Sequence, residues 1–398
     1  MVFVVAAATA LVATPIVRKA AVLSGAIDRP SDRKVHPRPT PTVGGLAIFM
    51  AVLAGWGVSH LMPFFDRMYH ISSEPLGALV GGAVIMAIGA LDDIRGTTVP
   101  VKLSGQILAG GLLVLFGVQL LYFWFPGQGI LSLGADVAVP LSIVWIIAMI
   151  NAVNLIDGLD GLAAGLVAIA ALAFFAYISL SPPSPFFTGT GSPAALVSAI
   201  AAGAAIGFLP WNFHPAKIFM GDSGAMLLGL LLATATISGV GRNPFYAPSS
   251  GDLAAFSIPV LIPLVVLAVP FLDVLFAVFR RMARGRAITA PDKEHIHHRL
   301  MDFGHSHRKA VLLMYLWSIL ISATALAVAL LDGPLWIGLI ALTSALIILA
   351  TALPRVWWSR TRMARVQERR QSAAARATAD GATKPPVPAA IKAKDTSA

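Results

Sequence analysis

A regular repeat of polar residues marks the stretch 151–165. Its members fall at every third position: Asn151, Asn154, Asp157 and Asp160. Side chains three apart on a helix are neighbours, about 5–6 Å apart at Cβ, so the spacing predicts two carboxylates and two amides in one small volume. Two like charges this close favour a bound cation. Small residues beside the carboxylates leave room for backbone or a ligand: Gly158, Gly161 and Gly165. A solvated turn between helices is the alternative interpretation, and the fourfold repeat weakens it.

Three further aspartates have the residue type that a cation site of this kind needs. Asp92 and Asp93 end the third apolar run of the chain, and Asp222 precedes the eighth. The chain has 9 His and no Cys, which excludes disulfides, thiolate nucleophiles, iron–sulfur clusters and Cys-ligated zinc. Oxygen ligands without sulfur suit a hard cation, and we expect Mg²⁺, with Mn²⁺ as a substitute.

Cationic and imidazole side chains accompany these acids. Basic residues in the first polar loop and at the start of the fourth apolar run could bind phosphate: Lys34, Arg38 and Lys102. The last polar loop holds a dense group of candidates: His295, His297, His298, Arg299, His305 and His307. Each basic residue alone could simply orient the chain in a membrane, and the histidines could be surface residues. Together with the carboxylates they predict binding of a phosphorylated substrate.

The composition places these residues in an all-α integral membrane protein. Of the 398 residues, 57% are hydrophobic and 12% are charged, and the mean hydropathy is +0.80, whereas soluble domains have about 25% charged residues. Eleven apolar runs are long enough, or nearly so, to cross a hydrocarbon core of about 30 Å. They lie near 2–17, 43–63, 75–91, 103–125, 136–153, 160–180, 192–210, 224–241, 252–280, 310–331 and 334–353.

The basic residues predict the orientation of these spans. If the N-terminus is outside, 27 of the 29 Lys and Arg residues fall in cytoplasmic segments, and only Arg67 and Arg242 fall outside, as the positive-inside rule requires. Topology therefore explains the net charge of +10, and we expect no nucleic-acid partner. The sequence predicts a transmembrane catalytic domain over 1–353 and a basic, disordered cytoplasmic tail over 354–398.

The chain resembles the polyprenyl-phosphate N-acetylhexosamine-1-phosphate transferases. The resemblance extends from about Asp28 to Lys309 and rests on five motifs in order: Lys34 to Gly45, Asp92-Asp93 with Lys102 to Gln106, the stretch 151–165, Asn212 to Gly224, and the histidine loop. Within this superfamily, His295-Ile-His-His-Arg-Leu300 resembles the branch that uses UDP-N-acetylglucosamine. The phospho-N-acetylmuramoyl-pentapeptide transferase branch, which has consecutive histidines at this point, is the alternative.

The resemblance implies a reaction in which N-acetylglucosamine-1-phosphate passes from UDP-N-acetylglucosamine to undecaprenyl or decaprenyl phosphate, releasing UMP. It implies that Asp222, with Asp157 nearby, binds the metal. The implied catalytic set is Asp92, Asp93, Asp157 and Asp160, with Asp92 or Asp93 deprotonating or positioning the lipid phosphate. The implied site lies at the cytoplasmic face of the plasma (inner) membrane, among membrane lipids. The sequence does not decide whether the protein forms a homodimer.

The resemblance also implies three groups of substrate-binding residues. The nucleotide is assigned to Asn154, Asn212 and Phe219, the last by stacking on uracil. The diphosphate and sugar are assigned to His295, His297, His298 and Arg299. The lipid phosphate or diphosphate is assigned to Lys34, Arg38 and Lys102.

Two other classes of membrane protein share some of these features. A secondary transporter of an anionic solute also has many spans and kinking prolines, but its binding groups lie near the middle of the bilayer, whereas the motifs here fall at one face. A histidine-box oxygenase with an iron pair would also use clustered histidines. Its activity would depend on oxygen, and the transferase reaction does not.

Overall fold

The computed structural model of the protein describes residues 1–28, 39–125, 129–181, 189–239, 282, 306–331, 333, 335–349 and 351. The predicted ninth span, 252–280, and the predicted tail, 354–398, lie outside the described residues. The elements that position the site belong to Met1–Ala345, which forms one compact unit.

Long helices make up most of the described chain. They are α1 (Val2–Ser24), α2 (Gly45–His60), α4 (Glu74–Arg95), α5 (Val99–Leu115), α6 (Ala135–Ile156), α7 (Leu162–Leu180), α8 (Pro193–Asn212), α9 (Gly221–Ser238) and α13 (His307–Leu330), followed by a shorter helix at Leu335–Leu349. Short elements join them: β1 (Ile27–Asp28), β2 (Thr40–Pro41), η1 (Pro63–Phe65), α3 (Asp66–Ile71), β3 (Tyr122–Phe125), β4 (Gly129–Ser132) and η2 (Gly189–Gly191). Strands β1 and β2 pair antiparallel, as do β3 and β4.

Seven helices of the described chain are long and apolar enough to cross a membrane, or eight if one bent pair counts as a span. The protein is therefore a multi-pass membrane protein, and the count of eleven spans stays a prediction. The predicted run 43–63 contains α2, and the chain bends by 87° between α2 and Pro63–Ile71, because Pro63 cannot continue the hydrogen bonding of a helix. Another predicted run was wrong in detail. In the run 103–125, helix α5 ends at Leu115, and Tyr122–Phe125 forms strand β3 of the β3–β4 hairpin.

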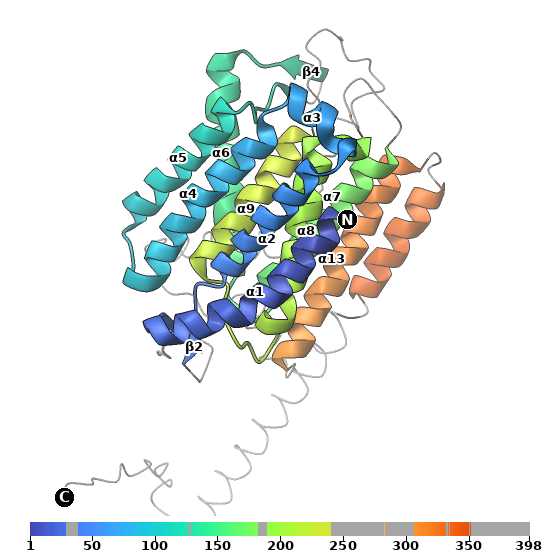
Figure 1. Ribbon diagram of the computed structural model, residues 1–398. Helices are drawn as coiled ribbons and strands as arrows, with labels where there is room; N and C mark the ends of the chain where they lie inside the picture. The colour runs from blue at the N-terminus through green and yellow to red at the C-terminus, as the bar shows by residue number, and fades with distance from the viewer. Residues whose placement is uncertain are drawn as a thin grey trace, which may run out of the picture. The chain divides into compact units, whose positions relative to one another are not determined.

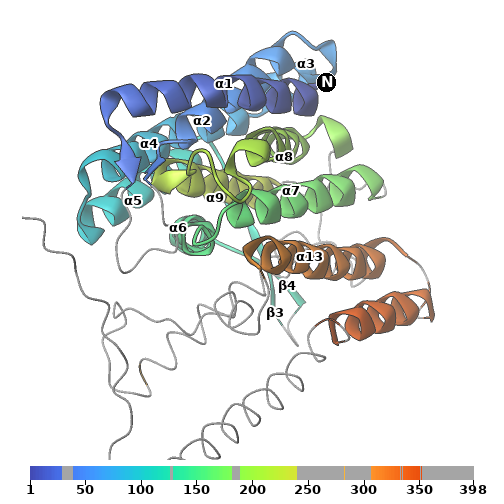
Figure 2. The ribbon, with the colours of Figure 1, turned by 90° about the horizontal axis from the view of Figure 1, so that it is seen from below.

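Helix α9 occupies the middle of the helix group, as Figure 2 shows. It packs against α2, α4, α6, α7 and α8. In its apolar 18-residue stretch 83% is buried, whereas the corresponding share is 33% in α1 and in α13. A helix that is apolar on every side belongs in a core. Small residues allow the close approach of its neighbours: a Cβ atom on Gly229 would lie 2.7 Å from Cα of Ile150 in α6. The first turn of this central helix carries Asp222.

The connections that carry the predicted motifs meet at one end of the helices. In Figure 1, β2 lies at that end, and α3 and β4 lie at the opposite end. Backbone bonds tie the connection before α2 to the one before α9: Phe219 N–H donates to Pro41 O (2.8 Å), and the Gly44 and Gly45 N–H groups donate to Phe219 O and Met220 O (both 3.0 Å). Two motifs that are far apart in the sequence are therefore parts of one local structure.

Candidate functional site

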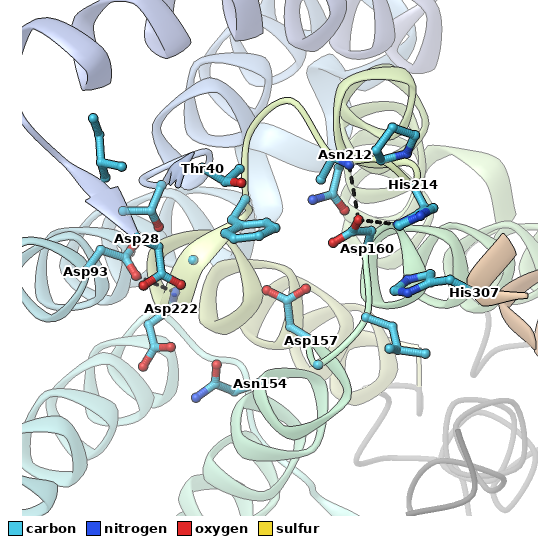
Figure 3. A pocket seen from close by; sticks show the side chains of 18 of the residues that line it. Asp28, Thr40, Asp93, Asn154, Asp157, Asp160, Asn212, His214, Asp222 and His307 are labelled. Carbon is cyan, nitrogen blue, oxygen red and sulfur yellow. Dashed lines mark hydrogen bonds and ion pairs between the residues drawn. The ribbon is translucent and has the colours of Figure 1, made fainter. Parts of the chain in front are cut away.

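A cavity of about 800 Å³ lies where these connections meet. Figure 3 shows carboxylates projecting into it from several elements, with Asp157 between an Asp93–Asp222 end and an Asp160–His214 end. Eight of the predicted site residues line it: Asp92, Asp93, Asn154, Asp157, Asp160, Asn212, Phe219 and Asp222. A ninth, Lys102, contacts two of these carboxylates. The other six lie outside the described residues: Lys34, Arg38, His295, His297, His298 and Arg299.

The polar repeat of 151–165 does not lie on one helix. Helix α6 ends at Ile156, and Asp157 is its C-cap. Gly161 has φ of +81° at the start of α7, a backbone conformation that residues with side chains rarely adopt. Helical spacing therefore holds only up to Asn154. Asn154, Asp157 and Asp160 nevertheless line the cavity, whereas the Asn151 amide donates to Gln106 Oε1 (2.8 Å) and Ile147 O (2.7 Å) in the helix packing.

Asp157 differs from the other predicted carboxylates in that no group of the described residues compensates it. No hydrogen bond or ion pair reaches it from the described part of the chain. Burial raises the pKa of Asp157 well above its ordinary value, and the charges of Asp222, Asp93 and Asp160 raise it further. A cation bound beside these oxygens would favour the ionised form.

Lys102 compensates two other carboxylates. Its Nζ atom lies 2.7 Å from Asp92 Oδ2 and 2.5 Å from Asp222 Oδ2. The other oxygen of Asp92 accepts bonds from the backbone N–H (2.7 Å) and hydroxyl (2.6 Å) of Thr97. Lys102 thus joins the start of α5 to the end of α4 and the start of α9. It was predicted to bind a phosphate of the substrate, and here it neutralises the acids beside which such a phosphate would bind.

Asp93 is bonded to the first turn of α9. Its carboxylate accepts from Asp222 N–H (2.8 Å), Ser223 N–H (3.2 Å) and the Ser223 hydroxyl (2.7 Å). Asn212 has a comparable position at the other connections. It is 2% exposed, its Oδ1 accepts from Gly161 N–H (3.1 Å), and its Nδ2 donates to Ile218 O (3.1 Å). Asn212 therefore holds together the two connections that form the cavity wall.

Two histidines line the cavity: His307, which the sequence analysis named among the candidates of the last polar loop, and His214, which it did not name. Nδ1 of His214 lies 2.7 Å from Asp160 Oδ2, which also accepts from Ala216 N–H (3.1 Å). The rings of His214 and His307 stack at 4.1 Å between centroids, with 15° between their planes. The signal for His214 was present, since it lies inside the motif from Asn212 to Gly224.

Asp160, His214 and His307 bring potential ligand atoms within 4.8 Å of one another. A ring nitrogen binds a metal along its lone pair, which lies in the ring plane. Nearly parallel stacked rings direct their lone pairs into separate planes, so they do not converge on one ion. The close approach of His214 Nδ1 to Asp160 instead corresponds to a hydrogen bond that fixes the orientation of the imidazole. The carboxylates around Asp157 and Asp222 offer the better site for a hard cation.

Hydrogen bonds join α13 to the connection before α7 and to the connection before α9. The Tyr315 hydroxyl donates to Gly161 O, and Arg308 Nε donates to His214 O (2.8 Å). A Cβ atom on Gly165 would lie 2.1 Å from the Tyr315 ring. The absence of a side chain at Gly165 therefore allows α13 to lie against α7 with His307 at the cavity.

Comparisons with known proteins identify similar sequences. The sequence model of glycosyl transferase family 4 matches residues 75–240, a stretch that contains all five predicted carboxylates. The decaprenyl-phosphate N-acetylglucosaminephosphotransferase of Mycobacterium tuberculosis (strain CDC 1551 / Oshkosh) is 40% identical over 313 residues, covering 77% of this chain and 76% of the relative. The probable undecaprenyl-phosphate N-acetylglucosaminyl 1-phosphate transferase of Bacillus subtilis (strain 168) is 36% identical over 338 residues, covering 85% and 86%. The undecaprenyl-phosphate alpha-N-acetylglucosaminyl 1-phosphate transferase of Escherichia coli (strain K12) is 28% identical over 353 residues, covering 85% and 87%.

The contact between Gly165 and Tyr315 predicts a non-additive pair of mutations. Gly165→Ala should lower the free energy of unfolding by about 1–3 kcal/mol, because a methyl group must enter a filled space. In a Tyr315→Ala background the same change should cost almost nothing, since the ring is gone. Denaturant unfolding in detergent measures both. Gly57→Ala in α2, where an added Cβ meets nothing within 4 Å, is the control. Additive losses would contradict the packing of α13 against α7.

Proposed function

The chain belongs to the polyprenyl-phosphate N-acetylglucosamine-1-phosphate transferase family, and from this premise we propose that it transfers N-acetylglucosamine-1-phosphate from UDP-N-acetylglucosamine to a polyprenyl phosphate. An oxygen of the lipid phosphate attacks the sugar-bearing phosphorus of the nucleotide. The bond from that phosphorus to the oxygen it shares with the other phosphate breaks, and UMP leaves. The product is polyprenyl-diphosphate-N-acetylglucosamine.

One observation carries the proposal: carboxylates from separate helices converge on a single cavity at the ends of the helices, and one of them, Asp157, has no compensating partner in the described chain. A nucleotide sugar dissolved in water and a carrier held in the bilayer can meet only at the membrane surface. Phosphoryl transfer depends mainly on positioning and on neutralising charge. A cavity lined with oxygen ligands and open at a helix end suits both requirements.

The oxygen-rich set of side chains fits a magnesium ion, with manganese as a substitute. Asp222 and Asp157 would hold it, because both line the cavity and Asp157 is uncompensated. The bound ion would neutralise negative charge on the phosphates of the nucleotide.

The chain's own residues would then bind and orient the two substrates. Asn154 and Phe219, which line the cavity, would contact the nucleotide, with the Phe219 ring against uracil. Asn212 would act through the connections that it holds together. Lys102 lies between Asp92 and Asp222, where its charge would also attract an incoming phosphate. By family resemblance, the diphosphate, sugar and lipid phosphate would be bound by the residues outside the described chain: Lys34, Arg38, His295, His297, His298 and Arg299.

The rival functions are less well supported. Relatives at 40% and 36% identity carry names with N-acetylglucosamine and not muramoyl-pentapeptide. A secondary transporter would hold its ligand groups near the middle of the bilayer, whereas the cavity in the described chain lies at helix ends. We further propose that the site faces the cytoplasm at the plasma membrane, because the basic residues concentrate in the segments on that side.

Radiolabelled UDP-N-acetylglucosamine tests the proposed reaction. Purified protein with polyprenyl phosphate and Mg²⁺ should yield a butanol-extractable labelled lipid and UMP, and a chelator should abolish both. The same incubation with UDP-N-acetylmuramoyl-pentapeptide should give no lipid product. Unmodified label accumulating inside sealed vesicles would instead indicate transport.

Asp222→Asn tests the metal assignment. We expect transfer to fall by at least about a thousandfold with the protein still folded, because the neutral amide lacks the charge of a carboxylate ligand. Elution on size exclusion and thermal unfolding provide the folding control. His60→Ala, at the opposite end of α2, should retain nearly full turnover. Near-normal turnover of a folded Asp222→Asn protein would refute the assignment.

Single-cysteine labelling tests the orientation, since the natural chain has no cysteine. Lys217→Cys lies in the connection before α9, and Ile71→Cys, where the side chain is 70% exposed, lies at the end of α3. In intact cells a membrane-impermeant maleimide should label Ile71→Cys directly and Lys217→Cys only after permeabilisation. The reverse pattern would place the cavity outside.

A further inference from the structure

Helix α9 begins without a capping side chain of its own. The first N–H groups of any helix have no partner within the helix, and an N-cap residue with a side-chain oxygen usually accepts one of them. The N-cap of α9 is Met220, whose side chain has no oxygen. The N–H groups of Asp222 and Ser223 therefore need an acceptor from elsewhere.

Asp93 of α4 supplies that acceptor. One carboxylate oxygen accepts from Asp222 N–H at 2.8 Å. The other accepts from Ser223 N–H at 3.2 Å and from the Ser223 hydroxyl at 2.7 Å. Both oxygens are thus engaged by the first turn of α9. A negative charge here also interacts favourably with the positive end of the helix dipole.

The backbones of both helices are shaped for this contact. Gly221 has φ of +69°, and a Cβ atom there would lie 2.3 Å from the Asp93 carboxylate. Gly89 lies one helical turn before Asp93, on the same face of α4, and a Cβ atom there would lie 2.4 Å from Cα of Ser223. Side chains at either glycine would separate α4 from the start of α9. The contact is therefore built from both sides and does not depend on Asp93 alone.

We propose that Asp93 is a positioning residue that caps α9 from a neighbouring helix and so fixes Asp222 in the cavity, and that it is not the base for the lipid phosphate. This inference rests on the proposed function, in which Asp222 holds the metal. The three bonds that its two oxygens accept hold Asp93 against the first turn of α9. The second pKa of a phosphate monoester is about 6, so near neutral pH the lipid phosphate is largely dianionic and needs no base.

The conservative variant Asp93→Asn separates the two roles. Its single amide oxygen can still accept from the first turn of α9, since Asn and Asp are similar N-cap residues, and its NH2 group replaces the second acceptor, so the cap is weakened and not lost. At saturating Mg²⁺ we expect kcat to stay within about tenfold of the natural protein. Asp93→Ala, which has no acceptor, should raise the Mg²⁺ concentration for half-maximal rate by about threefold to thirtyfold, the range expected from loss of a cap. Loss of several orders of magnitude in kcat for Asp93→Asn, at every Mg²⁺ concentration, would overturn the proposal.

Direct metal binding gives a readout that does not depend on turnover. Free Mn²⁺ measured by electron paramagnetic resonance reports the affinity of the purified full chain. Asp93→Ala and Gly221→Ala should weaken Mn²⁺ binding alike, because the first removes the cap and the second pushes α9 away while keeping the carboxylate. Gly111→Ala in α5, where an added Cβ meets nothing within 4 Å, should leave the affinity unchanged. An unchanged Mn²⁺ affinity in folded Gly221→Ala protein would contradict the proposal. If Asp93→Ala does not fold, the Mn²⁺ affinities of Asp93→Asn and Gly221→Ala decide the question.

Failure of this inference is distinguishable from failure of the proposed function. If Asp222→Asn loses both turnover and Mn²⁺ affinity while Asp93→Asn loses turnover equally with natural Mn²⁺ affinity, then Asp93 is catalytic and the transferase site stands. If Asp222→Asn retains both, the metal assignment fails, and the positioning role fails with it.

Discussion

The structure of the site depends on how the protein compensates several carboxylates that share one cavity. Like charges in a partly buried space raise one another's free energy unless each has a partner. Lys102 partners Asp92 and Asp222, the first turn of α9 partners Asp93, and His214 partners Asp160. Asp157 has no such partner in the described chain, so a bound cation would stabilise its ionised form.

These compensating groups come from different helices, so the charge balance exists only in the folded chain. Lys102 starts α5, and its two acids belong to α4 and α9. Helix α9 is also the most deeply buried of the candidate spans in the described chain. Its first turn therefore serves the core and the site together. A change that shifts α9 in the core would also move Asp222, which couples packing to the chemistry of the cavity.

The sequence predicted the broad architecture and most of the cavity. Apolar runs located the helices because hydrophobic length is a local property, and the distribution of charge placed the motifs on one side. Local pattern could not show where helices end: α6 stops before Asp157, and the run 103–125 turns into a hairpin after Leu115. Partners distant along the chain were equally hidden. Lys102 and Asp222 are 120 positions apart, and Asp160 and His214 are 54 apart.

Residue type alone could not show which polar side chains also build the cavity. Asp93 and Asn212 both have the chemistry to bind ligands, yet their polar atoms are bonded to the connections and the helix that form the cavity. A site assembled from connections needs such bonds, because those segments lack the hydrogen bonding of a helix. Asn154 and Asp157 line the same cavity, and no bond to their side chains occurs within the described chain. The bonds that Asp93 and Asn212 make therefore show that both side chains help to build the cavity.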